Sequence, residues 1–301
     1  EQDRKVFWKS PFKLEIPIVL VKIMASSNTD EEIFFLALMT AIECLQCVET
    51  TIQETFLGAF QKIDGHGVEF LAIILRYINK LLFNIEKSMG KINKHEMIQS
   101  ILDQGDTRSV QQSHSIDDHV KNCRSVFEFL RLLCEGHNRK LQNFMRTQSK
   151  DKSSREIPSI NMLIVSCDLI TSFTKYLNKQ CLSAVVEIVN FLVETVQGPC
   201  RSNQLCLIDC KIVDCCKEFL TEIEAPEDLA AKGFAESDSE SRKVLGYTFH
   251  SLVKLMDSIL EGGQNKAFLK EIGKGFEFDT LVHQMRIVYV EYFTDNLKIT
   301  E

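Results

Sequence analysis

Apolar side chains recur along most of the chain at the three- and four-residue spacing of α-helices. The clearest case is residues 68–87, where Phe70, Ile74 and Ile78 share one face. Further helices are predicted at residues 31–48, 50–61, 139–146, 158–178, 183–196, 241–260 and 278–297, with another that ends at Glu135. No stretch alternates polar and apolar residues as a half-buried β-strand does. The sequence therefore predicts an all-α fold.

Two polar stretches interrupt the helical pattern. Residues 90–119 are rich in Gln, Ser, Asp and Lys, and residues 222–241 are acidic and contain Pro226. Both stretches are predicted to be loops, because neither carries enough apolar residues to bury a helix face. The longest apolar runs, residues 34–48 and 181–196, each contain an acid and are too short to cross a membrane.

Three helix ends along the chain resemble one another, because each has an apolar helix, a glycine, an asparagine and a short helix in that order. They lie at residues 132–141, 193–203 and 259–268. The acids at these ends, Glu135, Glu194 and Glu261, are 59 and 67 residues apart. Recurring helical units usually stack, since no single unit can bury its own apolar face. We therefore expect residues 1–301 to form one armadillo-like helical repeat array, an α-solenoid, rather than a globin-like cluster.

Glu135 is predicted in the last turn of its helix, where unpaired carbonyls and the helix dipole already present negative charge. Stacked helices lie about 8 to 10 Å apart, so Glu135 and Glu194 would be neighbours. Two carboxylates supply at most four of the roughly six to eight oxygens that Ca²⁺ takes. We therefore expect an incomplete calcium site that carbonyls, water or another domain completes, with Glu261 solvated. The alternative is that these acids are solvated glutamates near helix ends.

Composition and motifs argue against several function classes. The net charge is −7, from 35 basic and 42 acidic residues, and no basic stripe carries aromatic residues, so nucleic acid is not an expected partner. The eleven cysteines lie within apolar helical patterns, as reduced thiols of a cytosolic protein do. Cys44 and Cys47 lack the second pair that a structural zinc site needs. Cys134 and His137 have no residue to orient them and no catalytic motif appears, so we do not expect an enzyme.

Two motifs carry a resemblance to a known family. Residues 133–148, Leu-Cys-Glu-Gly-His-Asn-Arg-Lys-Leu-Gln-Asn-Phe-Met-Arg-Thr-Gln, resemble the associated homology region shared by inositol trisphosphate receptors and ryanodine receptors. Residues 193–204, which contain Val-Glu-Thr-Val-Gln-Gly-Pro-Cys and then Asn-Gln, resemble the second signature of that family. The resemblance covers residues 117–222. At Gly136 the sequence resembles the ryanodine receptor branch. At Arg139, and in the short spacer between the two motifs, it resembles the inositol trisphosphate receptor branch, which we favour.

This resemblance implies a function. The chain is expected to be a cytosolic regulatory segment of a homotetrameric, ligand-gated calcium-release channel at the cytosolic face of the endoplasmic reticulum membrane. In that family, glutamates that match Glu135 and Glu194 bind regulatory Ca²⁺, positions that match His137 and Gln197 support them, and a carbonyl from the domain after the pore completes the site.

The partners that the resemblance implies are other domains of the same channel, with the membrane contacted only through the pore region. The alternative function is a helical-repeat scaffold or protein-interaction module without metal binding.

Overall fold

The computed structural model describes residues 15–26, 29–46, 49–88, 116–148, 159–175, 179–224, 239–262, 269–270 and 273. Its helices are α2 (Glu15–Ala25), α3 (Glu31–Leu45), α4 (Thr50–Asp64), α5 (Val68–Ser88), α7 (Ile116–Cys134), α8 (Arg139–Arg146), α9 (Met162–Thr174), α10 (Lys179–Val196), α11 (Arg201–Asp209), α12 (Ile212–Glu224) and α14 (Ser239–Leu260). No strand occurs in these ranges, so the all-α prediction is confirmed.

The two predicted loops lie mostly outside the described residues, as does the predicted helix at 278–297. Their described edges are helical, because α7 already begins at Ile116, α12 extends to Glu224 and α14 begins at Ser239. Asp117 and Asp118 lie in the first turn of α7, where a helix favours acidic side chains. The polar composition that suggested a loop there is therefore that of a helix start.

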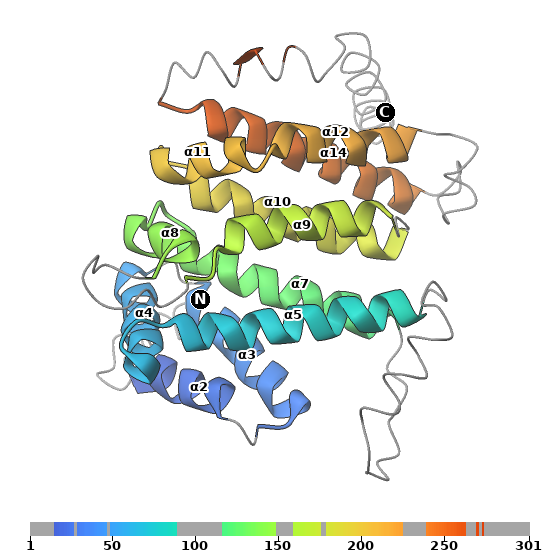
Figure 1. The fold of residues 1–301 in the computed structure, drawn as a ribbon. Helices are drawn as coiled ribbons and strands as arrows, with labels where there is room; N and C mark the ends of the chain where they lie inside the picture. The colour runs from blue at the N-terminus through green and yellow to red at the C-terminus, as the bar shows by residue number, and fades with distance from the viewer. Residues whose placement is uncertain are drawn as a thin grey trace, which may run out of the picture.

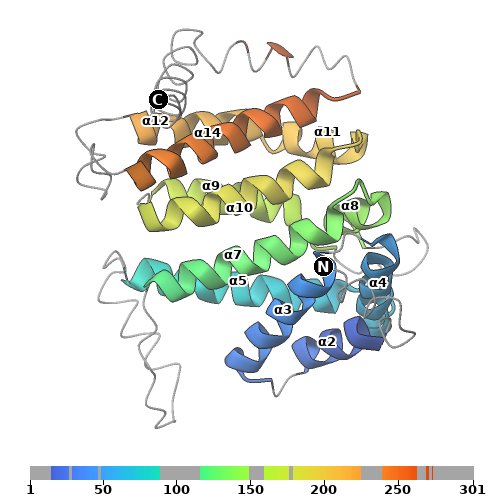
Figure 2. The same cartoon turned by 180° about the vertical axis from the view of Figure 1, so that it is seen from behind.

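The helices form two layers that stack along one axis (Figures 1 and 2). One layer contains α5, α9 and α12, and the other contains α7, α10 and α14. Within the second layer, α10 packs between α7 and α14. The short helices α8 and α11 lie with α4 at one end of both layers, and α2 and α3 cover the N-terminal end of the stack (Figure 1). This arrangement is the expected helical repeat array.

Stacking follows from helices that are apolar on more than one side. In α10 the fully buried side chains include Leu182, Ala184, Val185, Ile188, Val189, Phe191, Leu192 and Val196. A helix buried on both flanks needs a neighbour on each, so α10 cannot be stable without α7 and α14. Aromatic rings extend the core towards the N-terminal end, where the rings of Phe60 and Phe70 stack with centroids 4.1 Å apart.

Each long helix of the second layer ends in the same way. Gly136, Gly198 and Gly262 follow α7, α10 and α14 with φ of 74°, 75° and 69°. These left-handed values favour glycine and end the helices, and the glycines are 62 and 64 residues apart. After the first of them, Asn138 caps α8 by accepting a hydrogen bond from the backbone N–H of Leu141.

Candidate functional site

Three glutamines connect the repeats. Each follows the N-cap residue of its helix, α4, α8 or α11, by four positions, and its side-chain Nε2 donates to two carbonyls at the end of the next helix of the second layer. The bonds run from Gln53 to Leu132 and Glu135 (2.9 and 2.8 Å), from Gln142 to Glu194 and Gln197 (2.8 and 2.9 Å), and from Gln204 to Ser258 and Glu261 (both 3.0 Å). Carbonyls at a helix end lack partners within the helix, so these bonds satisfy them. We call each pair of bonds a glutamine clasp.

The clasps fix which residues of the repeats are equivalent. Glu135, Gln197 and Glu261 occupy one position, and each precedes the glycine that ends its helix. Glu194 lies one turn earlier, at the position that Leu132 fills in the preceding unit. The sequence aligned Glu194 with Glu135 and Glu261 because all three are acids near helix ends, and that alignment was wrong by three residues.

Glu135 follows α7 directly and is engaged by a cation of its own helix. Arg131, one turn earlier, donates from Nη1 to Glu135 Oε2 at 3.2 Å. The same guanidinium donates from Nε to Glu187 Oε1 on α10 at 2.6 Å. Arg131 is 24% exposed in its side chain, so this three-residue bridge across α7 and α10 is largely shielded from water.

Glu194 lies in the last full turn of α10 and is half-buried. Burial raises the pKa of Glu194 above the ordinary value of a glutamate. The positive charge of Lys254 on α14 opposes this shift, and the negative charge of Glu135 adds to it. Arg131 and His137 also oppose it. The structure therefore brings Glu135 close enough to Glu194 for its negative charge to act on the Glu194 carboxylate.

The two residues expected to support the acids lie on different sides of this junction. His137 has a left-handed φ of 61°, and its ring covers Gly198, where a Cβ added to the glycine would lie 2.7 Å from His137 Cγ. Gln197 donates from its side chain to Ser258 Oγ on α14 at 3.4 Å. His137 is thus near Glu194, while the amide of Gln197 faces the next repeat. Their supporting roles stay predictions.

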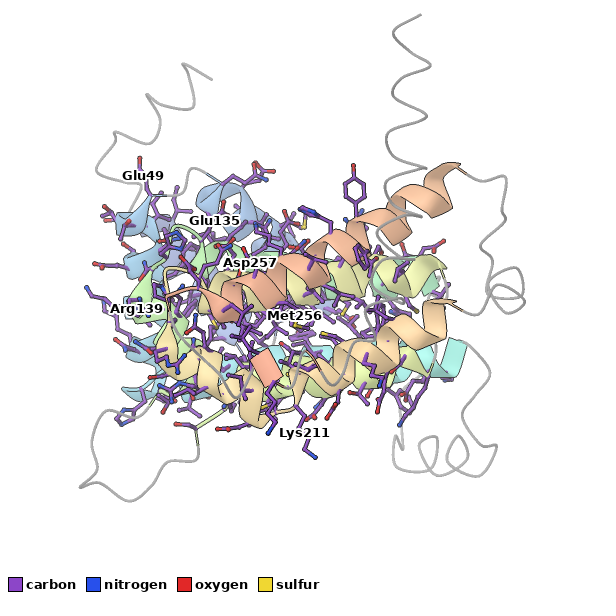
Figure 3. The ribbon with its side chains drawn as sticks, turned by 90° about the horizontal axis from the view of Figure 1, so that it is seen from above. Glu49, Glu135, Arg139, Lys211, Met256 and Asp257 are labelled. Atoms are coloured by element: carbon purple, nitrogen blue, oxygen red, sulfur yellow. The ribbon has the colours of Figure 1, made fainter. Side chains whose placement is uncertain are left out.

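A basic residue fixes the turn that follows α10. Arg139 of α8 donates from Nη1 to the Pro199 carbonyl at 2.8 Å and from Nη2 to the Gly198 carbonyl at 2.5 Å. Figure 3 looks down the stack and shows Glu135 and Arg139 at the end of the molecule where the short helices lie. The acid pair is therefore held where α7, α8 and α10 meet.

The acid pair fits one half of a calcium site. Carboxylate oxygens are the hard ligands that Ca²⁺ takes, but two carboxylates provide at most four of its roughly six to eight contacts. The described part of the chain contains no group of three or more His, Cys, Asp and Glu side chains that could hold a metal ion. Glu261 is exposed, as expected, and its Oε2 accepts a hydrogen bond from the Gly198 N–H at 2.9 Å.

Sequence reasoning missed Arg131 and the glutamine clasps. Arg131 had a local signal, because it precedes Glu135 by the four residues that place two side chains on one helix face. Its bond to Glu187, 56 residues away, had none. The clasps had a signal in the glutamine that recurs at one offset from the starts of α4, α8 and α11, as Gln53, Gln142 and Gln204.

Two further expectations can be compared with the structure. The cysteines among the described residues are free thiols, and most of them are buried. Of the helices that the structure describes, none combines the length and apolar character needed to cross a bilayer.

Comparison with known proteins agrees with the two motifs. The family described as RyR and IP3R Homology associated matches residues 117–220, a segment that contains both Glu135 and Glu194. The inositol 1,4,5-trisphosphate receptor itr-1 of Caenorhabditis elegans is 33% identical over an alignment of 86 residues, which covers 26% of this chain and 3% of that receptor. The chain therefore spans only a small part of the length of this relative. Residues 117–220 of the chain are therefore similar to the homology-associated region of ryanodine and inositol trisphosphate receptors.

Proposed function

We propose that this chain is a cytosolic regulatory segment of a ligand-gated intracellular calcium-release channel. The family of residues 117–220 supports this proposal, as does the similarity to a receptor for inositol 1,4,5-trisphosphate. The whole protein would then be a homotetramer in the endoplasmic reticulum membrane, with this segment on the cytosolic side and no catalytic activity of its own. Other domains of the same channel would be its partners.

Within that segment, Glu135 and Glu194 form this chain's half of a regulatory Ca²⁺ site. The observation that supports this assignment is that two carboxylates from consecutive repeats meet near one junction, where the negative charge of Glu135 acts to raise the pKa of Glu194, an effect smaller than those of burial and of Lys254. Bound Ca²⁺ would neutralise both charges. Because the two acids supply too few oxygens, a second domain must contribute the remaining ligands, and binding then depends on how the domains dock.

The clasps give this site a physical connection to the rest of the array. Gln142 ties the backbone of Glu194 to α8, which begins four residues after Glu135. Gln204 ties the end of α14 to α11, which follows α10. A displacement of the acid pair would therefore move α7, α10 and α14 together rather than bend one helix. Such a rigid unit can transmit the docking of a ligand domain over several repeats.

A scaffold without metal binding is the second candidate. One observation favours it, because α3 exposes a row of large apolar side chains, Ile33, Leu36 and Met39, with Leu36 exposed to 69%. Exposed apolar rows on a helix are typical of protein-binding surfaces. Under this alternative, Glu135 and Glu187 would serve only to pair with Arg131 and hold α7 against α10.

Charge-neutral replacement of the acid pair distinguishes these two functions. We expect Glu135→Gln combined with Glu194→Gln in the full-length protein to remove calcium activation or to raise the required calcium concentration at least tenfold, about the effect of losing metal-site contacts. Channel opening is measured against free calcium, with Glu261→Gln as the control because it removes the same charge at the neighbouring junction. An unchanged calcium response in the double variant would reject the sensor and leave the scaffold.

A further inference from the structure

Arg131 lies between the acids of two helices in a geometry that only a guanidinium can adopt. Its Nε faces Glu187 at 2.6 Å while its Nη1 faces Glu135 at 3.2 Å, so one planar group binds two carboxylates at once. The bond to Glu187 is the shorter of the two. The contact with Glu135 is the longer one, and it involves the more exposed acid, at 32% against 16%.

The charges around this guanidinium are mostly negative. Glu128, Glu135 and Glu187 all act on Arg131, and Arg131 in turn acts on Glu194. These acids come from α7, the residue directly after it, and α10, and like charges near one another destabilise the fold unless a cation lies among them. Arg131 supplies that cation from within the chain.

We propose that Arg131 is a built-in counter-ion of the acid pair, which a divalent cation must displace from Glu135 and which Glu187 then retains. This inference rests on the proposed calcium site and concerns what sets its affinity. An arginine cannot lose its charge by deprotonation, so the cation must break the Arg131–Glu135 bond directly. Calcium binding would then exchange one ion pair for another, with Arg131 held by its shorter bond to Glu187.

The exchange has a measurable consequence. Removing a positive charge within a few ångströms of a carboxylate changes the affinity of that carboxylate for a cation by about tenfold or more, as it does for a proton. Arg131→Met should therefore bind calcium at least about tenfold more tightly. The same variant should be less stable than the wild type in a calcium chelator, because Glu135 and Glu187 then lose their partner. No loss of packing alone gives both effects.

The experiment follows the thermal unfolding midpoint of the full-length protein against free calcium, which reports binding without channel activity. The rise of the midpoint with calcium that remains in Glu135→Gln measures calcium binding at all other sites of the protein. Lys140→Met is the matched control, because Lys140 is a cation of the same junction that pairs with Glu54 at 2.7 Å and not with the acid pair. We expect Lys140→Met to titrate like the wild type.

Two more variants separate the bridge from net charge. Arg131→Lys keeps the charge but cannot bind both carboxylates in one plane, so calcium affinity should rise part of the way towards that of Arg131→Met. Glu187→Gln removes the residue that retains Arg131, so calcium affinity should fall, and it should fall less when Arg131 is already methionine. Arg131→Lys titrating like the wild type would show that net charge alone matters, and would overturn the bridge.

The remaining outcomes distinguish the two levels of the proposal. If Glu135→Gln leaves the calcium-dependent midpoint unchanged, the calcium site itself is rejected. If Glu135→Gln removes the calcium effect while Arg131→Met titrates like the wild type, the site stands and the counter-ion role of Arg131 is overturned.

Discussion

The junction of α7 with α10 and the junction of α10 with α14 share one backbone design and differ in chemistry. In each, a glutamine clasp holds two carbonyls of the later helix. At the first junction, Arg131 pairs with Glu135, and the charges of both residues act on Glu194. At the second, Ser258 takes the position of Glu194, and Glu261 accepts a hydrogen bond from the Gly198 N–H. The second junction therefore holds no acid pair.

This difference shows how one repeat can carry a site that its neighbour lacks. The clasp and the glycine fix where the last turn of each helix lies, whatever side chains it presents. Only the side chains at two positions of that turn decide whether the junction is charged. A binding site can thus appear in one unit of the stack without changing the fold.

The largest stability effects are expected from the clasps. Gln53→Met, Gln142→Met and Gln204→Met each leave two helix-end carbonyls unpaired. Gln53 also accepts a hydrogen bond from Asn138 Nδ2 at 2.9 Å, whereas the Oε1 atoms of Gln142 and Gln204 are buried and have no partner among the described residues. Each orphaned buried group costs about 1–3 kcal/mol, so the three groups orphaned in Gln53→Met should cost roughly 3–9 kcal/mol. In the other two variants, removal of the unpaired Oε1 offsets one of the two carbonyls, which leaves a cost of roughly 1–3 kcal/mol.

This ranking is tested by measuring the thermal unfolding midpoints of the three full-length variants in a calcium chelator. Near-equal losses for Gln142→Met and Gln204→Met would support two junctions with one design. A much larger loss at Gln142 would mean that the acid pair contributes to the scaffold as well.

The helix-ending glycines provide a smaller effect with an internal control. A Cβ at Gly198 would lie 2.7 Å from His137 Cγ, and one at Gly262 would lie 2.3 Å from Pro199 Cγ. Gly65 has a similar φ of 82° but open space around it. Gly65→Ala should therefore cost about 1–2 kcal/mol from backbone strain alone. Gly198→Ala should cost more, and Gly262→Ala the most, because a proline ring yields less than a histidine side chain.

Unfolding midpoints of the three alanine variants test this order. Equal losses at all three glycines would show that the contacts with His137 and Pro199 do not constrain the junctions.

The smallest effect concerns pH. Because burial raises the pKa of Glu194, the folded protein binds this proton more tightly than the unfolded chain. Protonated Glu194 therefore stabilises the fold at pH values below its ordinary pKa of 4.5, and this stabilisation is lost as the pH rises through the raised pKa. In calcium-free buffer Glu194→Gln should be more stable than the wild type above that window, and the two should converge below it.

For Asp64, stability is expected to change with pH in the opposite direction. Burial favours its neutral form, but hydrogen bonds from the backbone of Glu69, Gly67 and His66 outweigh burial and lower the pKa of Asp64. Ionised Asp64 therefore stabilises the fold at pH values above its ordinary pKa of 3.8, and this stabilisation is lost as the pH falls through the lowered pKa. Asp64→Asn should therefore destabilise at neutral pH. The same direction of change for both variants would contradict these assignments.

Much of the fold could be predicted from the sequence, because apolar periodicity and glycine stops are local signals. The helix 139–146 was predicted with its observed bounds, since Asn138 and the basic last turn both mark its ends. The register of the repeats was not predicted from the acids, which are 59 and 67 residues apart, whereas the glycines are 62 and 64 apart. Glycine conformation reports the backbone, but acids can change position without altering it.

The acid pair could be anticipated, but its counter-ion could not. Stacking predicted that Glu135 and Glu194 would be neighbours, and with the offset of three residues, about 4.5 Å along the helix, the charge of Glu135 still acts on Glu194. The bond from Arg131 to Glu187 depends on how α7 and α10 cross, which no local pattern specifies. Tertiary ion pairs of this kind appear only once the helices are packed.

A structure of the full-length protein at saturating calcium, compared with one in chelator, tests the central claim most directly. We predict an added density between Glu135 and Glu194 at about 2.3–2.6 Å from their oxygens, together with a longer distance from Arg131 to Glu135. No such density is expected beside Ser258 and Glu261. A calcium-saturated structure in which Arg131 still binds Glu135 and nothing lies between the two acids would contradict the account.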